Sequence, residues 1–248
     1  MLSSKDSSDL SGISSKYPCS YLKPLSFFVS WQGVLTLAYT GFSPALAGLK
    51  QELNSKNPEL PRENPGSKWP KTSFGALKDN QRLTPEHLSV LLKLCRIFNE
   101  SLQTEAKKLL VDHLLIVIYK CRSLEKYLEL LKVPLSSEDQ LDDSMPSQQE
   151  QDNVQAVLQE ADHPSYWVSA SRDGNRESHY RGPALGCTLV ASLGGQTTFT
   201  NKTLDHNKGT QLTEVINQFR QQVDQSLPGM YAWFDDGSLH VTIRALMG

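Results

Sequence analysis

The sequence predicts an α+β fold, in which helices cover antiparallel sheets, and three observations support this fold class. Short runs rich in β-branched and aromatic residues are typical of strands, and they occur at 33–39, 72–77, 114–119 and 186–192. Longer segments between these runs repeat apolar residues at helical spacing. An Asp-Gly step at 236–237 separates two further apolar runs, which is typical of a β-hairpin.

The N-terminal part predicts a tail, two strands and a helix. Residues 1–24 are rich in serine and predict a mobile tail, and strands are expected at 27–29 and 33–39. Ser43-Pro44 then supplies an N-cap residue followed by proline in the first helical turn. The prolines of 54–68 predict a loop.

The middle of the chain predicts a strand at 72–77, a helix that begins at Thr84-Pro85 and a buried strand at 114–119. A short helix is expected from Ser123 through Leu131. The segment 133–163 contains no lysine or arginine and eight acidic residues, so we expect an acidic linker or insertion.

The C-terminal part repeats this order of elements. A strand is expected at 186–192, a helix from Thr213 to the Pro228-Gly229 step, and two strands at 231–234 and 238–246. The organisation predicted from these elements is a tail at 1–24, a first lobe at 25–132, the linker and a second lobe at 164–248.

The composition predicts a reduced protein that binds no membrane. The formal net charge of −2 gives no general attraction to nucleic acid or to anionic membranes. The segment between Lys23 and Lys50 has no charge, but its serines, threonines and proline favour a buried strand and helix over a membrane span. The N-terminus has no apolar signal segment, and the four cysteines form no CxxC pair. A cytoplasmic or nuclear monomer is expected, with no metal and no cofactor.

The two predicted lobes contain a similar pattern of residues. Each has a strand that starts with glycine, at 33–39 and 186–192, then a helix, then a strand that ends in Ala-Leu, at 71–77 and 240–246. The repeat predicts two pseudo-symmetric α/β lobes whose antiparallel sheets face a central cleft. Because side chains alternate along a strand, Lys71 and Ser73 share one face, and so do His240, Thr242 and Arg244.

The last strand carries the best candidate for a chemical site. The spacing of His240 and Thr242 places an imidazole beside a hydroxyl, which suits proton transfer near pH 7 next to a bound phosphate oxygen. Arg244 can add a bidentate phosphate contact, although an arginine at a strand end is often exposed to solvent. A structural histidine that bonds to a neighbour is the alternative interpretation of His240.

With this motif the sequence resembles the two-histidine (2H) phosphoesterases. The resemblance implies two α/β lobes, each with a His-x-Thr/Ser strand at a central cleft, that act without metal on 2′,5′ or 2′,3′-cyclic phosphodiesters. It also implies one histidine as general base and the other as general acid. The resemblance gives His240 and Thr242 catalytic roles, and Lys71, Ser73 and Arg244 phosphate contacts.

The first lobe departs from the family pattern because Lys71 stands where a histidine is expected. An unperturbed lysine titrates near 10.4, so it can steady a phosphate or donate a proton but is a poor base near neutrality. Another register would place Trp69 or Pro70 there instead. The pattern also occurs at His87 and at His163, where Pro164 disfavours a strand.

Other motifs favour no competing enzyme class, since GxxxxGK[ST], GxSxG and HExxH are absent. A basic patch of Arg172, Arg176, His179 and Arg181 near Tyr180 suits phosphate and base contacts, or is a solvated loop. Three functions therefore remain: a 2H-type phosphodiesterase, a scaffold that binds an RNA end or cyclic nucleotide without cleaving it, and an interaction protein. The last would recruit a protein partner through the linker or the tail.

Overall fold

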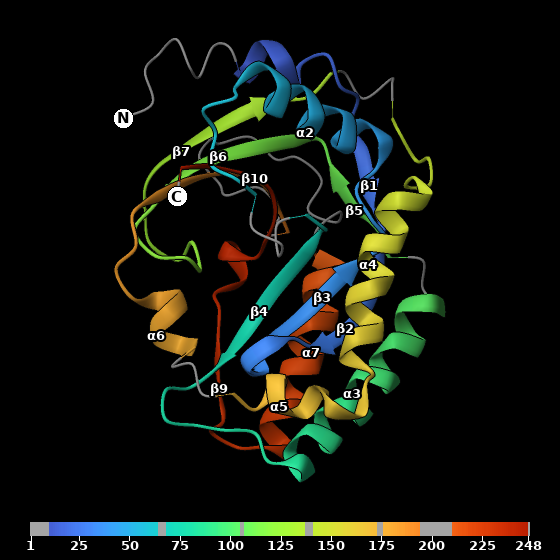
Figure 1. Ribbon diagram of the computed structural model, residues 1–248, viewed down its shortest axis with the longest axis vertical. Coiled ribbons are helices and arrows are strands. Elements are labelled where there is room, and N and C mark those ends of the chain that lie inside the picture. Colours follow the sequence, from blue (N-terminus) through green and yellow to red (C-terminus); the bar gives the residue numbers. More distant parts are fainter. Residues whose placement is uncertain are drawn as a thin grey trace.

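The computed structural model describes residues 10–63, 68–104, 107–136, 141–172, 176–193 and 210–247. Within these ranges the strands form two four-stranded sheets and one two-stranded sheet, and each pair of strands in them is antiparallel (Figure 1). The protein therefore has the mixed α+β fold that the sequence predicts.

The first sheet has the order β2-β3-β4-β9. Its strands are β2 (Pro24–Val29), β3 (Leu35–Tyr39), β4 (Lys71–Leu77) and β9 (Tyr231–Trp233). Two helices, α3 (Pro85–Thr104) and α7 (Thr210–Ser226), pack together on one face. Phe219 of α7 stacks on Phe27 at 4.8 Å between ring centroids and meets Phe74 edge-on, which anchors the helix to the sheet.

The second sheet has the order β10-β8-β6-β7. Its strands are β10 (His240–Met247), β8 (Gly186–Ser192), β6 (His113–Tyr119) and β7 (Tyr127–Pro134). Helix α2 (Pro44–Lys56) packs against β10. A two-stranded sheet joins β1 (Ser20–Leu22) to β5 (Leu109–Val111), and the short helices α5 (Trp167–Ala170) and α6 (Arg176–Arg181) precede β8.

Most elements lie where local sequence signals predict them. The Ser43 side chain accepts a hydrogen bond from the backbone amide of Leu46, and Pro44 begins α2. The segment without charges forms β2, β3 and the start of α2, and no helix in the described ranges has the length and apolarity to cross a membrane. All four cysteines are buried free thiols.

The predicted helix at 123–131 is wrong, because residues from Tyr127 onward form strand β7. This strand pairs with β6 along its length, from Tyr119 opposite Tyr127 to His113 opposite Pro134. Residues 127–134 adopt a strand because their backbone groups form hydrogen bonds with β6, and this pairing outweighs a weak local preference for helix.

The mobile tail expected at 1–24 is also wrong for the part that the structure describes. Residues 10–14 are helical, Ile13, Cys19 and Leu22 are buried, and β1 pairs with β5. Residues 1–9 lie outside the described ranges. Burial of these apolar side chains against the rest of the core orders the segment.

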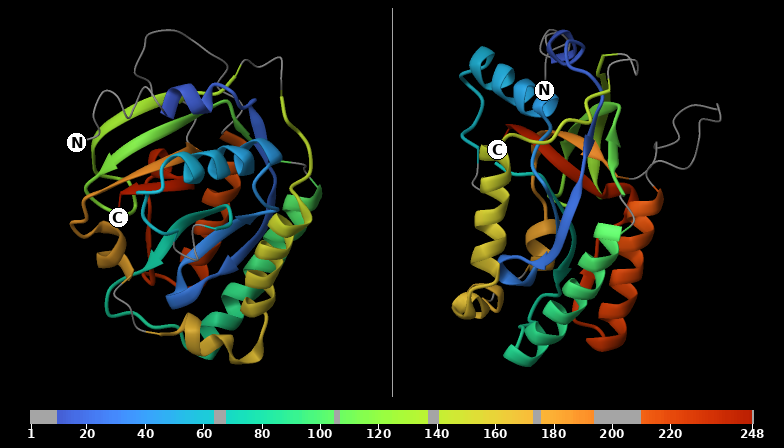
Figure 2. Two further views of the ribbon diagram at one scale, coloured as in Figure 1. Left: turned by 45° about the horizontal axis from the view of Figure 1, so that its top comes forward. Right: turned by 90° about the vertical axis from the view of Figure 1, so that its right-hand side faces the viewer.

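The acidic segment 133–163, expected to be a linker or insertion, contains the 14-residue helix α4 (Gln148–Ala161). Ser147 caps this helix, and the Glu150 carboxylate accepts a hydrogen bond from the backbone amide of Phe42. Figure 2 shows α4 on the side of the first sheet opposite to α3 and α7. Residues 137–140 lie outside the described ranges.

The predicted Asp-Gly hairpin does not form, because its two strands join different sheets. Strand β9 pairs with β4, whereas β10 pairs with β8, and a 3-10 turn at Asp236–Ser238 connects them. The buried Arg220 side chain holds this crossover by donating to the carbonyls of Phe234 and Phe74 and to the Asp236 carboxylate.

The lobes expected at 25–132 and 164–248 do not coincide with the sheets. Strands β6 and β7 belong to the second sheet, and β9 belongs to the first. The two strand pairs of the proposed repeat, β3 with β4 and β8 with β10, are each neighbours within one sheet. The pseudo-twofold relation between them stays a prediction.

Candidate functional site

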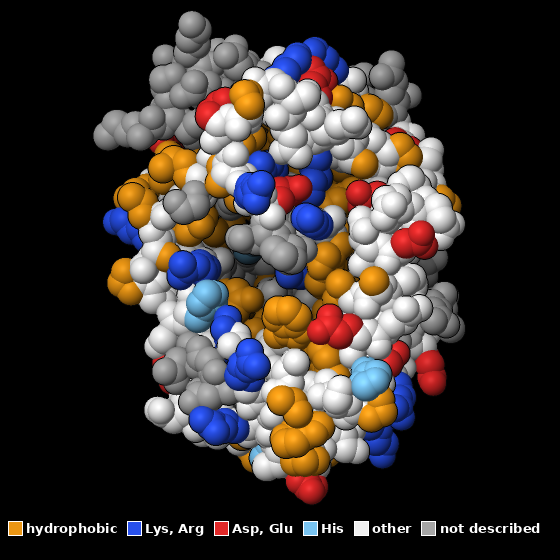
Figure 3. Space-filling model, in the orientation of Figure 1, with side chains coloured by type: hydrophobic (Ala, Val, Ile, Leu, Met, Phe, Trp, Pro, Cys, Tyr) orange, Lys and Arg blue, Asp and Glu red, His pale blue; other side chains and the backbone are white. Residues whose placement is uncertain are grey.

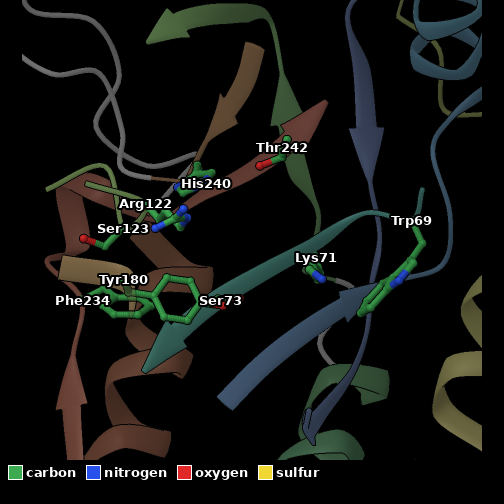
Figure 4. A pocket seen from close by; sticks show the side chains of 9 residues that line it. All are labelled: Trp69, Lys71, Ser73, Arg122, Ser123, Tyr180, Phe234, His240 and Thr242. Carbon is green, nitrogen blue, oxygen red and sulfur yellow. The ribbon is translucent and has the colours of Figure 1, made fainter. Parts of the chain in front are cut away.

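A cavity of about 280 Å³ lies where β4 of the first sheet meets β10 of the second (Figure 4). Nine side chains line it: Trp69, Lys71, Ser73, Arg122, Ser123, Tyr180, Phe234, His240 and Thr242. Figure 3 shows Lys and Arg side chains gathered around a hollow in this face. No acidic residue is among these lining side chains, so the cavity offers an anion positive charge and hydroxyl groups.

The structure brings four of the five predicted site residues together. Lys71 and Ser73 enter the cavity from β4, and His240 and Thr242 enter it from β10 (Figure 4). Both pairs follow the two-residue alternation of a strand. Trp69, which the alternative register would place opposite His240, lines the cavity beside Lys71. The lysine therefore keeps its predicted position, with Trp69 as a neighbour.

The His240 imidazole is oriented by the backbone of Ser238, two residues earlier in the chain. Its Nδ1 lies 2.7 Å from the Ser238 carbonyl oxygen, which can only accept, so Nδ1 carries the proton and Nε2 is left with a free lone pair. Burial lowers the pKa of His240, while the bond to Ser238 opposes the shift. The imidazole is therefore neutral at pH 7 and able to accept a proton.

The Lys71 amine is tuned by burial. Desolvation lowers its pKa to about 8, and Nζ lies 4.6 Å from the centroid of the Trp69 ring. No ion pair in the described part of the chain involves Lys71. Lys71 therefore departs from the value near 10.4 of an unperturbed lysine, and a pKa of about 8 leaves roughly one amine in ten uncharged at pH 7.

Arg244 does not line the cavity, in contrast to the prediction. The pairing of β10 with β8 shifts by one residue between Thr242 and Arg244, a β-bulge that ends the simple alternation. The buried guanidinium donates to Asn54 Oδ1 and to the Pro61 carbonyl, both at 2.7 Å. Arg244 therefore joins β10 to α2 and to the loop that follows α2.

The opposite wall of the cavity, which the sequence did not predict, includes Arg122, Ser123, Tyr180 and Phe234. The Tyr180 hydroxyl is hydrogen-bonded to Ser73, and burial raises the pKa of this tyrosine. Among these residues, only Tyr180 had a local sequence signal, because it lies in the patch of arginines and aromatic residues. Arg122 and Ser123 follow a predicted strand and belong to no recognisable motif.

One carboxylate, that of Glu125, joins the segments of this wall. It accepts from the Ser123 hydroxyl at 2.6 Å, from Arg181 Nε and Nη2 at 2.9 Å each, and from the Asp235 amide at 3.1 Å. Arg181 also donates to the Trp233 carbonyl at 2.6 Å. The loop after β6, helix α6 and the approach to β10 are therefore held by one set of charged hydrogen bonds.

The two other His-x-Ser motifs have local structural roles. The His163 side chain accepts from the backbone amide of Ser165 and begins a 3-10 turn, and His87 lies in the first turn of α3. Neither lines the cavity. No group of three or more His, Cys, Asp or Glu side chains suited to a metal occurs among the described residues.

No family model, no curated protein and no solved structure matches this chain.

Proposed function

We propose that the protein is a phosphoesterase similar to the two-histidine type, with Lys71 in place of the first histidine. Its substrate is a phosphodiester at an RNA end or in a cyclic nucleotide. One observation carries the proposal: Lys71 and His240, from strands of different sheets, line the same cavity together with the hydroxyls of Ser73 and Thr242. A proton acceptor and a proton donor beside hydroxyl groups are the kinds of group that general acid–base catalysis at a phosphate uses.

The protonation states support a division of labour at pH 7. Nε2 of His240 takes a proton from water as the water oxygen attacks phosphorus. The Lys71 ammonium gives a proton to the leaving ribose oxygen as the P–O bond breaks, and the product is a phosphate monoester. Two titratable groups with separated pKa values are typical of such acid–base pairs. Arg122, Ser73 and Thr242 hold the phosphate oxygens by charged and hydroxyl hydrogen bonds.

Lys71 itself favours a second candidate function, in which the cavity binds the same ligand without cleaving it. A lysine at this place supplies a positive charge that can bind the phosphate of the substrate, the transition state and the product equally well. Binding of that kind lowers the dissociation constant and does not accelerate a reaction.

The test is turnover and binding of adenosine 2′,3′-cyclic monophosphate by the wild-type protein and by His240→Ala. We expect kcat/KM to fall about 1,000-fold in the variant, which is the usual scale for a positioned acid or base. His163→Ala is the matched control, because it removes a histidine of the same motif outside the cavity, and it should leave the rate unchanged. Binding without turnover in the wild-type protein would favour the second candidate, and absence of binding would contradict both.

A further inference from the structure

A cluster of basic side chains borders the cavity beside helix α6. Arg122 lines the cavity, and its Nη1 donates to the backbone carbonyl of His179 at 3.4 Å. The His179 ring meets the ring of Tyr180 edge-on at 5.3 Å, and Tyr180 is itself a cavity residue. Figure 3 shows several Lys and Arg side chains on this face of the molecule. The cluster is therefore continuous with the cavity.

Arg176 completes the cluster and has an unsatisfied donor. Its Nε is buried and has no hydrogen-bond partner, and burial lowers the pKa of its guanidinium. Arg176 and His179 lie three residues apart on α6, and Arg122 contacts the His179 backbone. Burial first, and then the charges of Arg176 and Arg122, lower the pKa of His179. A buried donor without an acceptor is costly, so a site of this kind gains stability when an anion supplies the acceptor.

Arg181, on the same helix, has a structural role, because carboxylates neutralise its charge. It pairs with Glu125 and Glu177 and donates to the Trp233 carbonyl. In the described ranges no carboxylate forms an ion pair with Arg122 or Arg176. Arg122 and Arg176 thus differ from Arg181 in having no carboxylate partner, and arginines of this kind are typical of phosphate sites.

We propose that Arg122, Arg176 and His179 form a second anion subsite, which receives a second phosphate of the ligand whose first phosphate lies at His240. The assignment of the ligand as a nucleotide rests on the proposed function. The ligand class is then a nucleotide or RNA end with two phosphate groups on one ribose or on adjacent riboses. Arg122 lies between the two subsites and contacts both phosphates.

The test compares the equilibrium binding of adenosine 2′-monophosphate with that of adenosine 2′,5′-bisphosphate. Neither probe contains a phosphodiester, so both stay intact in the presence of the active protein. We expect the second phosphate to raise the affinity of the wild-type protein at least tenfold at fixed ionic strength. The Arg122→Gln/Arg176→Gln double variant should lose this gain.

Arg172→Gln is the matched control, because Arg172 is an exposed arginine that precedes α6 in the sequence and is not one of the residues of the proposed subsite. It should retain the tenfold gain, and thermal unfolding of each variant verifies that the fold is intact. Equal affinity for the two probes would overturn the subsite, and so would a gain that survives in the double variant or disappears in Arg172→Gln.

Failure of the subsite and failure of the proposed function are distinguishable. A gain that depends on Arg122 and Arg176, with no hydrolysis of the cyclic nucleotide, supports the subsite and contradicts only the catalytic proposal. Hydrolysis that depends on His240, without a gain in affinity from the second phosphate, supports the catalytic proposal and contradicts only the subsite. Absence of binding by both probes overturns the subsite.

Discussion

Strands β4 and β10 each place an ionisable side chain in the same cavity, but they control its proton in different ways. His240 on β10 is held by a 2.7 Å hydrogen bond to Ser238, which fixes its tautomer. Lys71 on β4 lies beside the Trp69 ring, and burial alone accounts for its lowered pKa. Burial shifts both groups toward the neutral form, yet at pH 7 it leaves the histidine neutral and the lysine largely charged. A single physical effect thus leaves one strand with a neutral imidazole and the other with a largely charged amine, which the proposed function uses as base and acid.

The largest expected effect on stability comes from Lys71→Met. A lysine whose pKa falls from 10.5 to about 8 on folding destabilises the native state by about 3 kcal/mol at pH 7. The variant should therefore have a free energy of unfolding higher by about that amount at pH 7. Between pH 8 and 10.5 the unfolded wild-type protein binds more protons at this residue, so wild-type stability rises and the difference closes. Urea unfolding at pH 7 and pH 10 measures both values.

His240→Leu sharpens the comparison, because urea unfolding at pH 7 should show a lower free energy of unfolding for this variant, in contrast to Lys71→Met. His240 is neutral at pH 7, so the substitution relieves no buried charge and loses the hydrogen bond to Ser238. We expect a loss of about 1 kcal/mol at pH 7. Below pH 6.5 the unfolded wild-type protein takes up a proton that the buried imidazole resists, so the variant should recover part of this loss. Stabilisation at pH 7 by both variants would show that the two strands do not differ in this way.

Lys71→Arg tests the proton-donor role that the proposed function gives to β4. Arginine keeps the positive charge but does not lose its proton in this pH range. We expect kcat/KM for the cyclic nucleotide to fall about 100-fold, and the decrease in rate above pH 8 to disappear from the pH profile. An unchanged rate with the alkaline decrease intact would show that Lys71 only binds the phosphate.

Glu125→Gln should act on stability alone, because it loosens the wall opposite the two strands without removing a group of the proposed mechanism. The carboxylate receives four hydrogen bonds, two of them from Arg181, and a neutral amide can accept only part of them. We expect a loss of about 2 kcal/mol in the free energy of unfolding. Glu177→Gln is the control, because Glu177 makes a more exposed pair with the same arginine, and about 0.5 kcal/mol is expected.

The alternation of side chains made the core of the site predictable. A polar residue at every second position of β4 and β10 has to face away from the buried positions between them, so Lys71, Ser73, His240 and Thr242 could be grouped by face. The prediction fails at Arg244, where the bulge interrupts the alternation. A bulge depends on the partner strand, and the sequence of β10 alone contains no sign of it.

The opposite wall of the cavity could not be predicted, because contacts between distant segments create it. Glu125 contacts Asp235, 110 residues away in the sequence, and Arg181, 56 residues away. The lowered pKa of Lys71 is equally a tertiary property, since it comes from burial by neighbours that the sequence does not place.

The sequence by itself determined where the main strands and helices lie and which side chains share a face, because these depend on local periodicity and on capping residues such as Ser43. The tertiary structure decided which sheet each strand joins. Strands β9 and β10 read locally as a hairpin, yet they separate because their backbone groups find partners in β4 and β8 and because Arg220 holds the crossover. That separation places His240 opposite Lys71 and so makes a cavity from two strands that are far apart in the chain.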